Sequence, residues 1–153
     1  DCSFIDRKEN IIVTGCTGTG KSFLATALGY QCCIKGYKVL YFNLGKLFAK
    51  LLMAKADGSY MRELSRIENC DLLIIDDFGL QAINNEKQLI LMDLIEDRHH
   101  KKSTIFCSQL PVKNWYDLIE EKTIADAILD RIIRSAIRFE LKGESMRKKM
   151  KNN

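Results

Sequence analysis

The sequence Ile-Ile-Val-Thr-Gly-Cys-Thr-Gly-Thr-Gly-Lys-Ser, residues 11–22, decides the fold. Its first four residues are all β-branched and predict a buried strand. Residues 15–22 match the pattern G-x-x-x-x-G-K-[ST] in full, and a helix is predicted to follow over 22–35, ending near Gly36. A strand that passes through a glycine-rich turn into a helix predicts a phosphate-binding loop in an α/β protein.

This loop combines the residue types that hold a nucleotide phosphate. Glycines let successive backbone N–H groups curl around an anion, and the following helix presents its positive end to the same anion. Lys21 is predicted to reach the β and γ phosphates of ATP, and the Ser22 hydroxyl to ligate Mg²⁺. A turn that only caps a helix is the alternative, but the complete pattern and its context favour phosphate binding. The predicted nucleotide-binding residues are Gly15, Cys16, Thr17, Gly18, Thr19, Gly20, Lys21 and Ser22.

Strands and helices alternate along the rest of the chain. This alternation predicts a mostly parallel five-stranded sheet covered on both faces, with the ligand at the carboxyl ends of the strands. The last strand alternates apolar and polar residues, which predicts a place at the sheet edge. The predicted strands are 11–14, 39–42, 72–75, 104–107 and 137–141, and the predicted helices are 22–35, 47–56, 60–67, 88–99, 117–119 and 124–133.

Polar residues follow two of these strands directly. Asp76 and Asp77 end the third strand, at the Walker B position of phosphate-binding-loop proteins. Asp76 is predicted to hold Mg²⁺ through its water shell, and Asp77 to orient or deprotonate the attacking water. The alternative is a turn that merely ends the strand. Ser108 and Gln109 end the fourth strand, where a side chain can touch the γ-phosphate or can simply cap the strand.

Composition and charge narrow the class of protein. The chain has 153 residues, a net charge of +4 and no apolar run near the ~20 residues of a membrane-spanning helix, so we expect one domain and no membrane. The basic tail 142–153 can neutralise nucleic-acid phosphates or be an ordinary solvated terminus. Six cysteines without a C-x-x-C pair predict reduced, mostly buried thiols in a cytoplasmic protein. The first residue is not Met, which suggests a fragment.

Five segments, in this order, resemble one protein family. The stretches 15–22, 72–79, 104–111, 125–132 and 141–148 are similar to those of IstB-like transposition helper ATPases. These are AAA+ proteins close to the bacterial helicase loader DnaC. The resemblance covers about residues 1–148, and its last two segments are far more specific than the phosphate-binding loop.

The resemblance implies a fold and a set of site residues. It implies a three-layer α/β/α sandwich with a five-stranded parallel sheet in the order 5-1-4-3-2. Few residues follow the last strand, so the helical lid of other AAA+ proteins is minimal or absent. Ser108 is implied as the sensor 1 residue, with Gln109 as the less favoured bearer. Arg131 is implied as an arginine finger that acts on a neighbouring subunit, and Arg147 as a sensor 2 arginine.

The resemblance also implies an activity. Residues 1–153 would form an AAA+ ATPase domain that oligomerises on duplex DNA in its ATP state and recruits or stimulates a transposase. An N-terminal segment that contacts DNA and transposase in relatives would be missing here. Many AAA+ proteins have Glu at the position of Asp77, so the shorter Asp77 is expected to contact the attacking water less directly.

Several alternatives stay open. The chain could be a DnaC-like replicative helicase loader, or a nucleotide-gated DNA-binding module with little hydrolysis. A small-molecule kinase is a further alternative, although Arg131 and Arg147 fit an oligomeric ATPase better. Arg131 could also be a surface arginine that pairs with an acid such as Asp130.

Overall fold

The computed structural model describes residues 1–16, 18 and 20–142. Five strands form one sheet in the order β2-β3-β4-β1-β5, and every neighbouring pair is parallel. This order is the one that the sequence predicts, and β5 lies at an edge as expected. The strands are β1 Asn10–Gly15, β2 Val39–Asn43, β3 Leu72–Asp76, β4 Ser103–Ser108 and β5 Ala136–Leu141.

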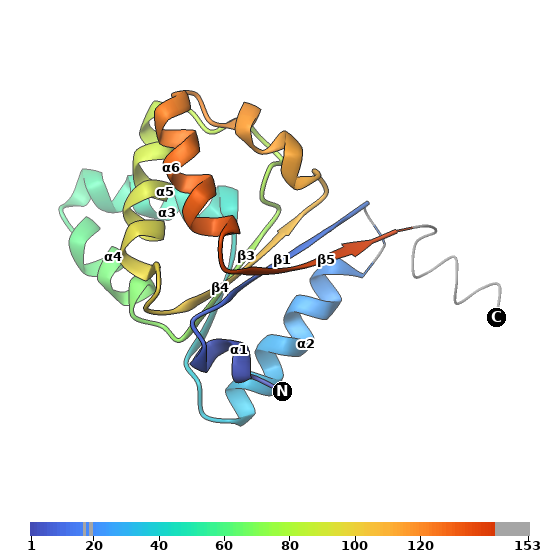
Figure 1. Cartoon of the computed structure of the whole chain (residues 1–153). Coiled ribbons are helices and arrows are strands. Elements are labelled where there is room, and N and C mark those ends of the chain that lie inside the picture. The colour runs from blue at the N-terminus through green and yellow to red at the C-terminus, as the bar shows by residue number, and fades with distance from the viewer. Residues whose placement is uncertain (17, 19, 143–153) are drawn as a thin grey trace.

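Helices cover both faces of the sheet. Figure 1 shows α1 and α2 on one side and α3, α4, α5 and α6 on the other, which makes three layers. Within the described residues, no helix is long and apolar enough to cross a membrane. The helices are α1 Ser3–Asp6, α2 Lys21–Ile34, α3 Leu44–Asp57, α4 Tyr60–Glu68, α5 Asn85–Arg98 and α6 Lys122–Ile133, with 3-10 turns at Val112–Asn114 and Tyr116–Leu118.

The two faces of the sheet pack separate apolar clusters. Every residue of β3 and of β4 is buried, because both strands lie inside the sheet between two helical layers. One cluster joins the sheet to α3–α6, and the other joins it to α1 and α2. The central strands are thus fixed from both sides, which holds their carboxyl ends in place.

Helix α2 lies close to the sheet at Gly29. A Cβ built on this glycine would stand 2.8 Å from the Cδ1 atom of Ile74 in β3. Only glycine therefore allows the helix backbone to come this near without a shift of the buried isoleucine. This close approach positions the amino end of α2 beside the ends of β1 and β3.

Two helix starts differ from the sequence prediction for reasons of capping. Helix α3 begins before the expected residue 47, because the Asn43 side chain accepts a hydrogen bond from the backbone of Lys46. Helix α5 begins at Asn85 because Asn84 accepts from Lys87 in the same way. The predicted helix at 117–119 is a 3-10 turn. The short helix α1 was not predicted.

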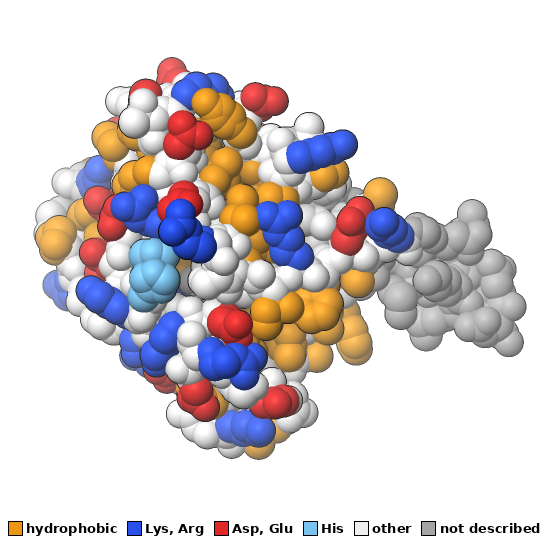
Figure 2. Space-filling model, in the orientation of Figure 1, with side chains coloured by type: hydrophobic (Ala, Val, Ile, Leu, Met, Phe, Trp, Pro, Cys, Tyr) orange, Lys and Arg blue, Asp and Glu red, His pale blue; other side chains and the backbone are white. Residues whose placement is uncertain are grey.

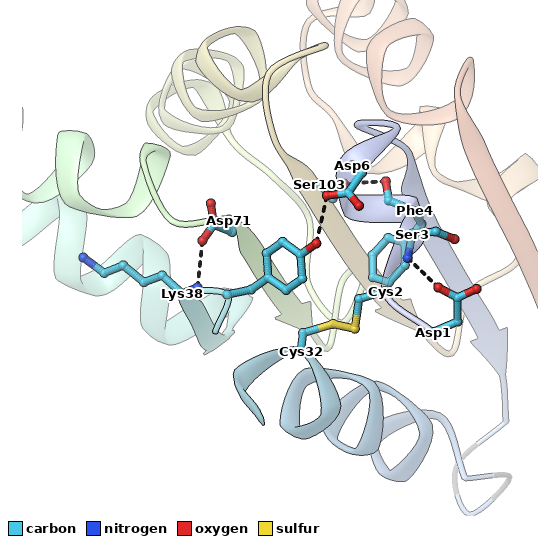
Figure 3. Close-up of a disulfide and its surroundings, with 10 residues drawn as sticks. Asp1, Cys2, Ser3, Phe4, Asp6, Cys32, Lys38, Asp71 and Ser103 are labelled. Carbon is cyan, nitrogen blue, oxygen red and sulfur yellow. Dashed lines mark hydrogen bonds between the residues drawn. A yellow bond between two sulfur atoms is a disulfide. The ribbon is translucent and has the colours of Figure 1, made fainter. Parts of the chain in front are cut away.

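The expectation that all six cysteines are reduced is wrong for one pair. Cys2, just before α1, and Cys32 of α2 form a disulfide, as Figure 3 shows. Their Cα atoms are 6.0 Å apart. The two cysteines are 30 residues apart in sequence, and no spacing motif predicts their pairing. It forms because Phe4 and Ile5 pack α1 into the same apolar cluster as Cys32. Cys70 and Cys107 are buried, as expected, whereas Cys16 and Cys33 are exposed.

Candidate nucleotide-binding site

The carboxyl ends of three central strands bring the predicted site residues to one edge of the sheet. Strand β4 lies between β1 and β3, so the phosphate-binding loop after β1 and the acids after β3 flank it on either side. Thr14 pairs with Ser108, and Asp76 pairs with Asn43 of the outer strand β2. We call this side of the molecule the carboxyl edge, and the opposite side, where the strands begin, the amino edge.

The phosphate-binding loop reaches α2 through glycines in left-handed conformations. Gly18 has φ 85° and Gly20 has φ 96°, and both values favour glycine over any other residue. Lys21, the first residue of α2, is buried, and its ammonium group donates a hydrogen bond of 3.2 Å to the carbonyl of Cys16. The lysine is thus folded back over the loop. Thr17 and Thr19 lie outside the described residues.

Ser22 and Asp76 meet directly at this edge. The Ser22 hydroxyl donates a 2.9 Å hydrogen bond to Oδ2 of Asp76, while Oδ1 accepts one of 2.8 Å from the backbone of Asp77. These are hard oxygen groups of the kind that Mg²⁺ takes when phosphates and water supply its other ligands. In the described part of the chain, no three His, Cys, Asp or Glu side chains gather into an all-protein metal site. The donor set therefore suits Mg²⁺ bound together with a nucleotide.

Asp77 is held in an unusual backbone conformation. Its φ of 57° lies in the left-handed region, which Asp tolerates better than most residues with a side chain. Its Oδ2 accepts a 2.6 Å hydrogen bond from the side-chain amide of Asn43. The predicted catalytic acid is thus engaged by the end of β2. Sequence reasoning missed Asn43, although a polar residue at the carboxyl end of a strand is the same signal that identifies Asp76.

A second residue of β2 also touches the acids. The Tyr41 phenol donates a short hydrogen bond to Oδ2 of Asp76. Partial burial and this bond raise the pKa of Tyr41 above its ordinary value, so the phenol keeps its proton. The sequence showed Tyr41 only as one member of an apolar strand.

Ser108 and Gln109, adjacent at the carboxyl end of β4, lie in different surroundings. Ser108 is fully buried; its hydroxyl donates to the carbonyl of Phe78 and accepts 3.0 Å from the backbone of Leu110. Gln109 is exposed and lines a cavity of about 290 Å³ together with Asp77. Gln109 and the candidate catalytic acid thus line the same cavity, whereas the Ser108 hydroxyl is engaged by neighbouring backbone groups. The sensor 1 role of Ser108 stays a prediction.

Arg131 lies far from this site. It is near the end of α6 and borders a small pocket with Asn10, the first residue of β1, and His99. Strand β1 is six residues long, so about 17 Å of strand separates Arg131 from the phosphate-binding loop. Its guanidinium pairs with Glu96 at 2.7 Å, not with Asp130, which pairs with Arg134. Figure 2 shows basic side chains around the two histidines on this face.

The remaining predicted residue belongs to the end of the chain. Arg147 and all of segment 143–153 lie outside the described residues, as does most of the basic tail. The sensor 2 role of Arg147 and the contact of the tail with DNA therefore stay predictions.

Comparison with known proteins identifies relatives across the whole chain. The family model of IstB-like ATP binding proteins matches residues 1–153. A Sinorhizobium fredii protein, y4pL, whose name assigns it to an insertion sequence and to ATP binding, is 43% identical over 145 residues. Its counterpart from the insertion sequence IS21 of Pseudomonas aeruginosa is 34% identical over 149 residues. These matches cover 95% and 97% of the chain but only 59% and 56% of the relatives.

Solved structures show the same fold. The DnaC helicase loader superposes with a TM-score of 0.79 at 20% identity, over 92% of this chain and 85% of that one. DnaA from Aquifex aeolicus, solved with AMPPCP, superposes with a TM-score of 0.77 at 21% identity, over 94% of this chain and 46% of that one. At these identities the likeness establishes the AAA+ fold of the DnaC and DnaA type, and nothing finer.

Proposed function

The chain belongs to the family of IstB-like ATP binding proteins, and from this premise we propose that it is a Mg²⁺-dependent ATPase that assists transposition. In its ATP state the full-length protein would oligomerise on duplex DNA and recruit or stimulate a transposase. The chain spans just under 60% of its insertion-sequence relatives, so DNA and transposase contacts can also involve parts beyond it.

One observation carries the ATPase proposal. Lys21, Ser22, Asp76 and Asp77 come from two separate segments, yet the fold brings them to one edge, where Ser22 and Asp76 touch at 2.9 Å. A lysine and a hydroxyl at a helix start, facing two acids at a strand end, form the arrangement that phosphoryl transfer requires. A glycine-rich turn that only capped a helix would have no reason to face these acids.

Each residue has a distinct task in this proposal. The backbone of residues 15–20 and the start of α2 bind phosphate oxygens, and Lys21 adds a positive charge in a buried position. Ser22 and Asp76 would hold Mg²⁺, which would supply positive charge to neutralise the nucleotide phosphates. Asp77 would accept the proton of the attacking water, once its carboxylate is free of Asn43.

Two substitutions test this assignment. Lys21→Ala should weaken ATP binding by about a hundredfold or more, because it leaves buried phosphate charge without its partner. Asp77→Asn should keep ATP binding and stop hydrolysis, because it preserves shape and removes the base. Calorimetry measures the first effect and single-turnover hydrolysis the second.

A matched control accompanies the lysine variant. Lys35 stands at the opposite end of α2 and is exposed, so Lys35→Ala should bind ATP like the wild type. Equal affinity of Lys21→Ala and Lys35→Ala would refute the assignment of the loop. A hydrolysis rate that rises with duplex DNA, and not with small-molecule acceptors, would separate this ATPase from a kinase.

Two further functions remain as alternatives with specific support. The Asn43–Asp77 bond favours a nucleotide-gated module that hydrolyses ATP slowly. The superposition on the DnaC helicase loader, which extends over 85% of that chain, leaves a helicase as the alternative partner. Pull-down of transposase or replicative helicase by the full-length protein decides between the partners.

A further inference from the structure

Strand β2 contributes a tyrosine to the acid that would hold the cation. Tyr41 pairs with Ile74 in the parallel register, so Asp76 is its diagonal neighbour two residues further along β3. Diagonal neighbours are within reach of a long aromatic side chain. The phenol spans this gap and donates a hydrogen bond to Oδ2 of Asp76.

The carboxylate of Asp76 is held from three directions. Oδ2 accepts from Ser22 at 2.9 Å and from Tyr41, and Oδ1 accepts from the backbone of Asp77 at 2.8 Å. Asp76 is only 6% exposed although it ends its strand. Of these three donors, Tyr41 is the one that belongs to neither the phosphate-binding loop nor the Asp76–Asp77 pair.

Packing alone does not explain a tyrosine at position 41. Its side chain belongs to neither apolar cluster, and the residue is 49% exposed. A half-exposed aromatic residue on an edge strand gains little from burial, whereas a hydrogen bond to an ionised carboxylate is stronger than one between neutral groups. The contact that distinguishes Tyr41 is therefore its bond to Asp76.

We propose that Tyr41 is a positioning residue for the divalent cation: its phenol fixes the Asp76 carboxylate and so strengthens the coupling between Mg²⁺ and nucleotide binding. This role rests on the proposed Mg²⁺-dependent ATPase function. Groups that orient the side chains around a metal typically contribute 10–100-fold to metal affinity. Because two other donors also hold Asp76, we expect the lower end of this range.

The test compares nucleotide affinity with and without the cation. The full-length protein is titrated with a fluorescent, non-hydrolysable ATP analogue, once in excess Mg²⁺ and once in EDTA. Tyr41→Phe should reduce the Mg²⁺-dependent gain in affinity by roughly tenfold and leave the affinity in EDTA unchanged. Damage to the fold would instead lower both affinities.

Tyr37→Phe is a matched control. The Tyr37 phenol also donates to an aspartate, at 2.8 Å to Asp6, and its side chain packs against the apolar cluster that contains Cys2 and Cys32. This variant removes the same chemical group and should keep the wild-type gain. Thermal melting of both variants checks that each is folded.

The outcomes separate the two proposals. An equal Mg²⁺-dependent gain in wild type and Tyr41→Phe would overturn the role of Tyr41 and leave the ATPase proposal intact. Equal losses in Mg²⁺ and in EDTA would show that Tyr41 is structural, which also overturns it. A wild type whose nucleotide affinity ignores Mg²⁺ would sink the proposed function, and the role of Tyr41 with it.

Discussion

The carboxyl edge and the amino edge of the sheet both contain buried, positively charged side chains, but these side chains differ in how many hydrogen-bond acceptors surround them. At the amino edge, Arg98 is 3% exposed and donates to a ring of acceptors, namely the backbone carbonyls of Ile67, Glu68, Cys70 and Ser103 and the hydroxyl of Thr104. At the carboxyl edge, Lys21 is also buried, yet among the described residues its ammonium donates to one carbonyl, that of Cys16.

This difference distinguishes structure from function. A buried arginine whose donors meet backbone carbonyls ties α4, α5, β4 and the turn before β3 together, and most of its hydrogen-bonding capacity is used within the fold. Within the described residues, the buried Lys21 ammonium has one acceptor, and it lies at the same edge as acids that accept from Ser22 and Asn43. We infer that this arrangement leaves room for an additional partner. The amino edge therefore stabilises the fold, while the carboxyl edge is expected to bind the nucleotide.

Arg131 is an exception to this division, because it lies at the amino edge but is proposed to act in ATP hydrolysis. Its substitution has the largest expected effect on the rate. Its side chain is 28% exposed, pairs with Glu96 and donates to the Ala127 carbonyl at 2.9 Å. We propose that it leaves Glu96 to act on a neighbouring subunit. An arginine finger is worth about 10³ to 10⁵ in rate. Arg131→Ala should therefore bind ATP as an isolated subunit, keep its melting temperature, and lose DNA-stimulated hydrolysis by about this factor, measured at steady state.

Arg134→Ala is the control, since Arg134 lies just after α6 and forms an exposed pair with Asp130 at 2.7 Å. That variant should hydrolyse ATP normally. Mixing Arg131→Ala with Lys21→Ala subunits should restore part of the activity, because each supplies the half-site that the other lacks. Full DNA-stimulated activity of Arg131→Ala alone would make the residue a simple ion-pair partner of Glu96.

Substitution of Arg98 should have the opposite effect to that of Arg131: it should lower stability and leave nucleotide binding intact. Arg98→Lys keeps the charge but cannot satisfy acceptors arranged around a planar guanidinium, so several carbonyls lose their donors. We expect a loss of about 3 kcal/mol in unfolding free energy, with the nucleotide affinity of the folded protein unchanged. Urea unfolding with and without nucleotide measures both. A stable Arg98→Lys protein with weakened nucleotide binding would contradict the division between the two edges.

The sequence predicted which segments meet at the carboxyl edge because its signals there are local, while the roles of their residues stay predictions. Gly15 to Ser22 and Asp76-Asp77 lie within short segments whose residue types, in that order, are typical of phosphate and Mg²⁺ binding. The sheet order also followed, through the resemblance. Arg98 and the Cys2–Cys32 disulfide were missed because each joins segments distant in sequence, and such pairing leaves no periodicity. Asn43 and Tyr41 were missed because their partners belong to the neighbouring strand.

Asn43 offers a smaller and sharper test of the carboxyl edge. A donor at 2.6 Å engages the Asp77 carboxylate and holds it in place. If this bond restrains hydrolysis, Asn43→Ala should raise the basal rate by about tenfold, since one such bond is worth about 1–1.5 kcal/mol. Single-turnover hydrolysis without DNA measures this rate.

Asn84→Ala is a closely matched control for Asn43→Ala. Both asparagines cap a helix, accepting from Lys46 at 3.2 Å and from Lys87 at 3.1 Å, so both variants should lose similar stability. Only Asn43 also touches Asp77. A fall in the rate of Asn43→Ala alone would mean that Asn43 positions the acid instead of restraining it.

Substitution of Glu68 has the smallest expected effect, a shift in the pH dependence of stability. It tests whether the amino edge holds a protonated acid in the folded state. Its backbone carbonyl is bonded by Arg98, but its carboxyl lies near Asp97 and Asp93 of α5. Burial, followed by the hydrogen bond and charge of Asp97, raises the pKa of Glu68 from 4.5 to about 8. The folded state therefore holds a proton that the unfolded state releases between these two pH values, and stability falls as pH rises through this window. Glu68→Gln removes that titration, so its melting temperature should decline less from pH 5 to pH 8 and should exceed that of the wild type by a few degrees at the upper end.

Glu63→Gln is the control in the same helix, since Lys50 and Arg66 lie 3.5 Å from its carboxylate. This variant should leave the slope of melting temperature against pH unchanged. Parallel melting curves for wild type and Glu68→Gln across this range would show that Glu68 is ionised in the folded protein, and that the amino edge tolerates an acid pair which the present geometry disfavours.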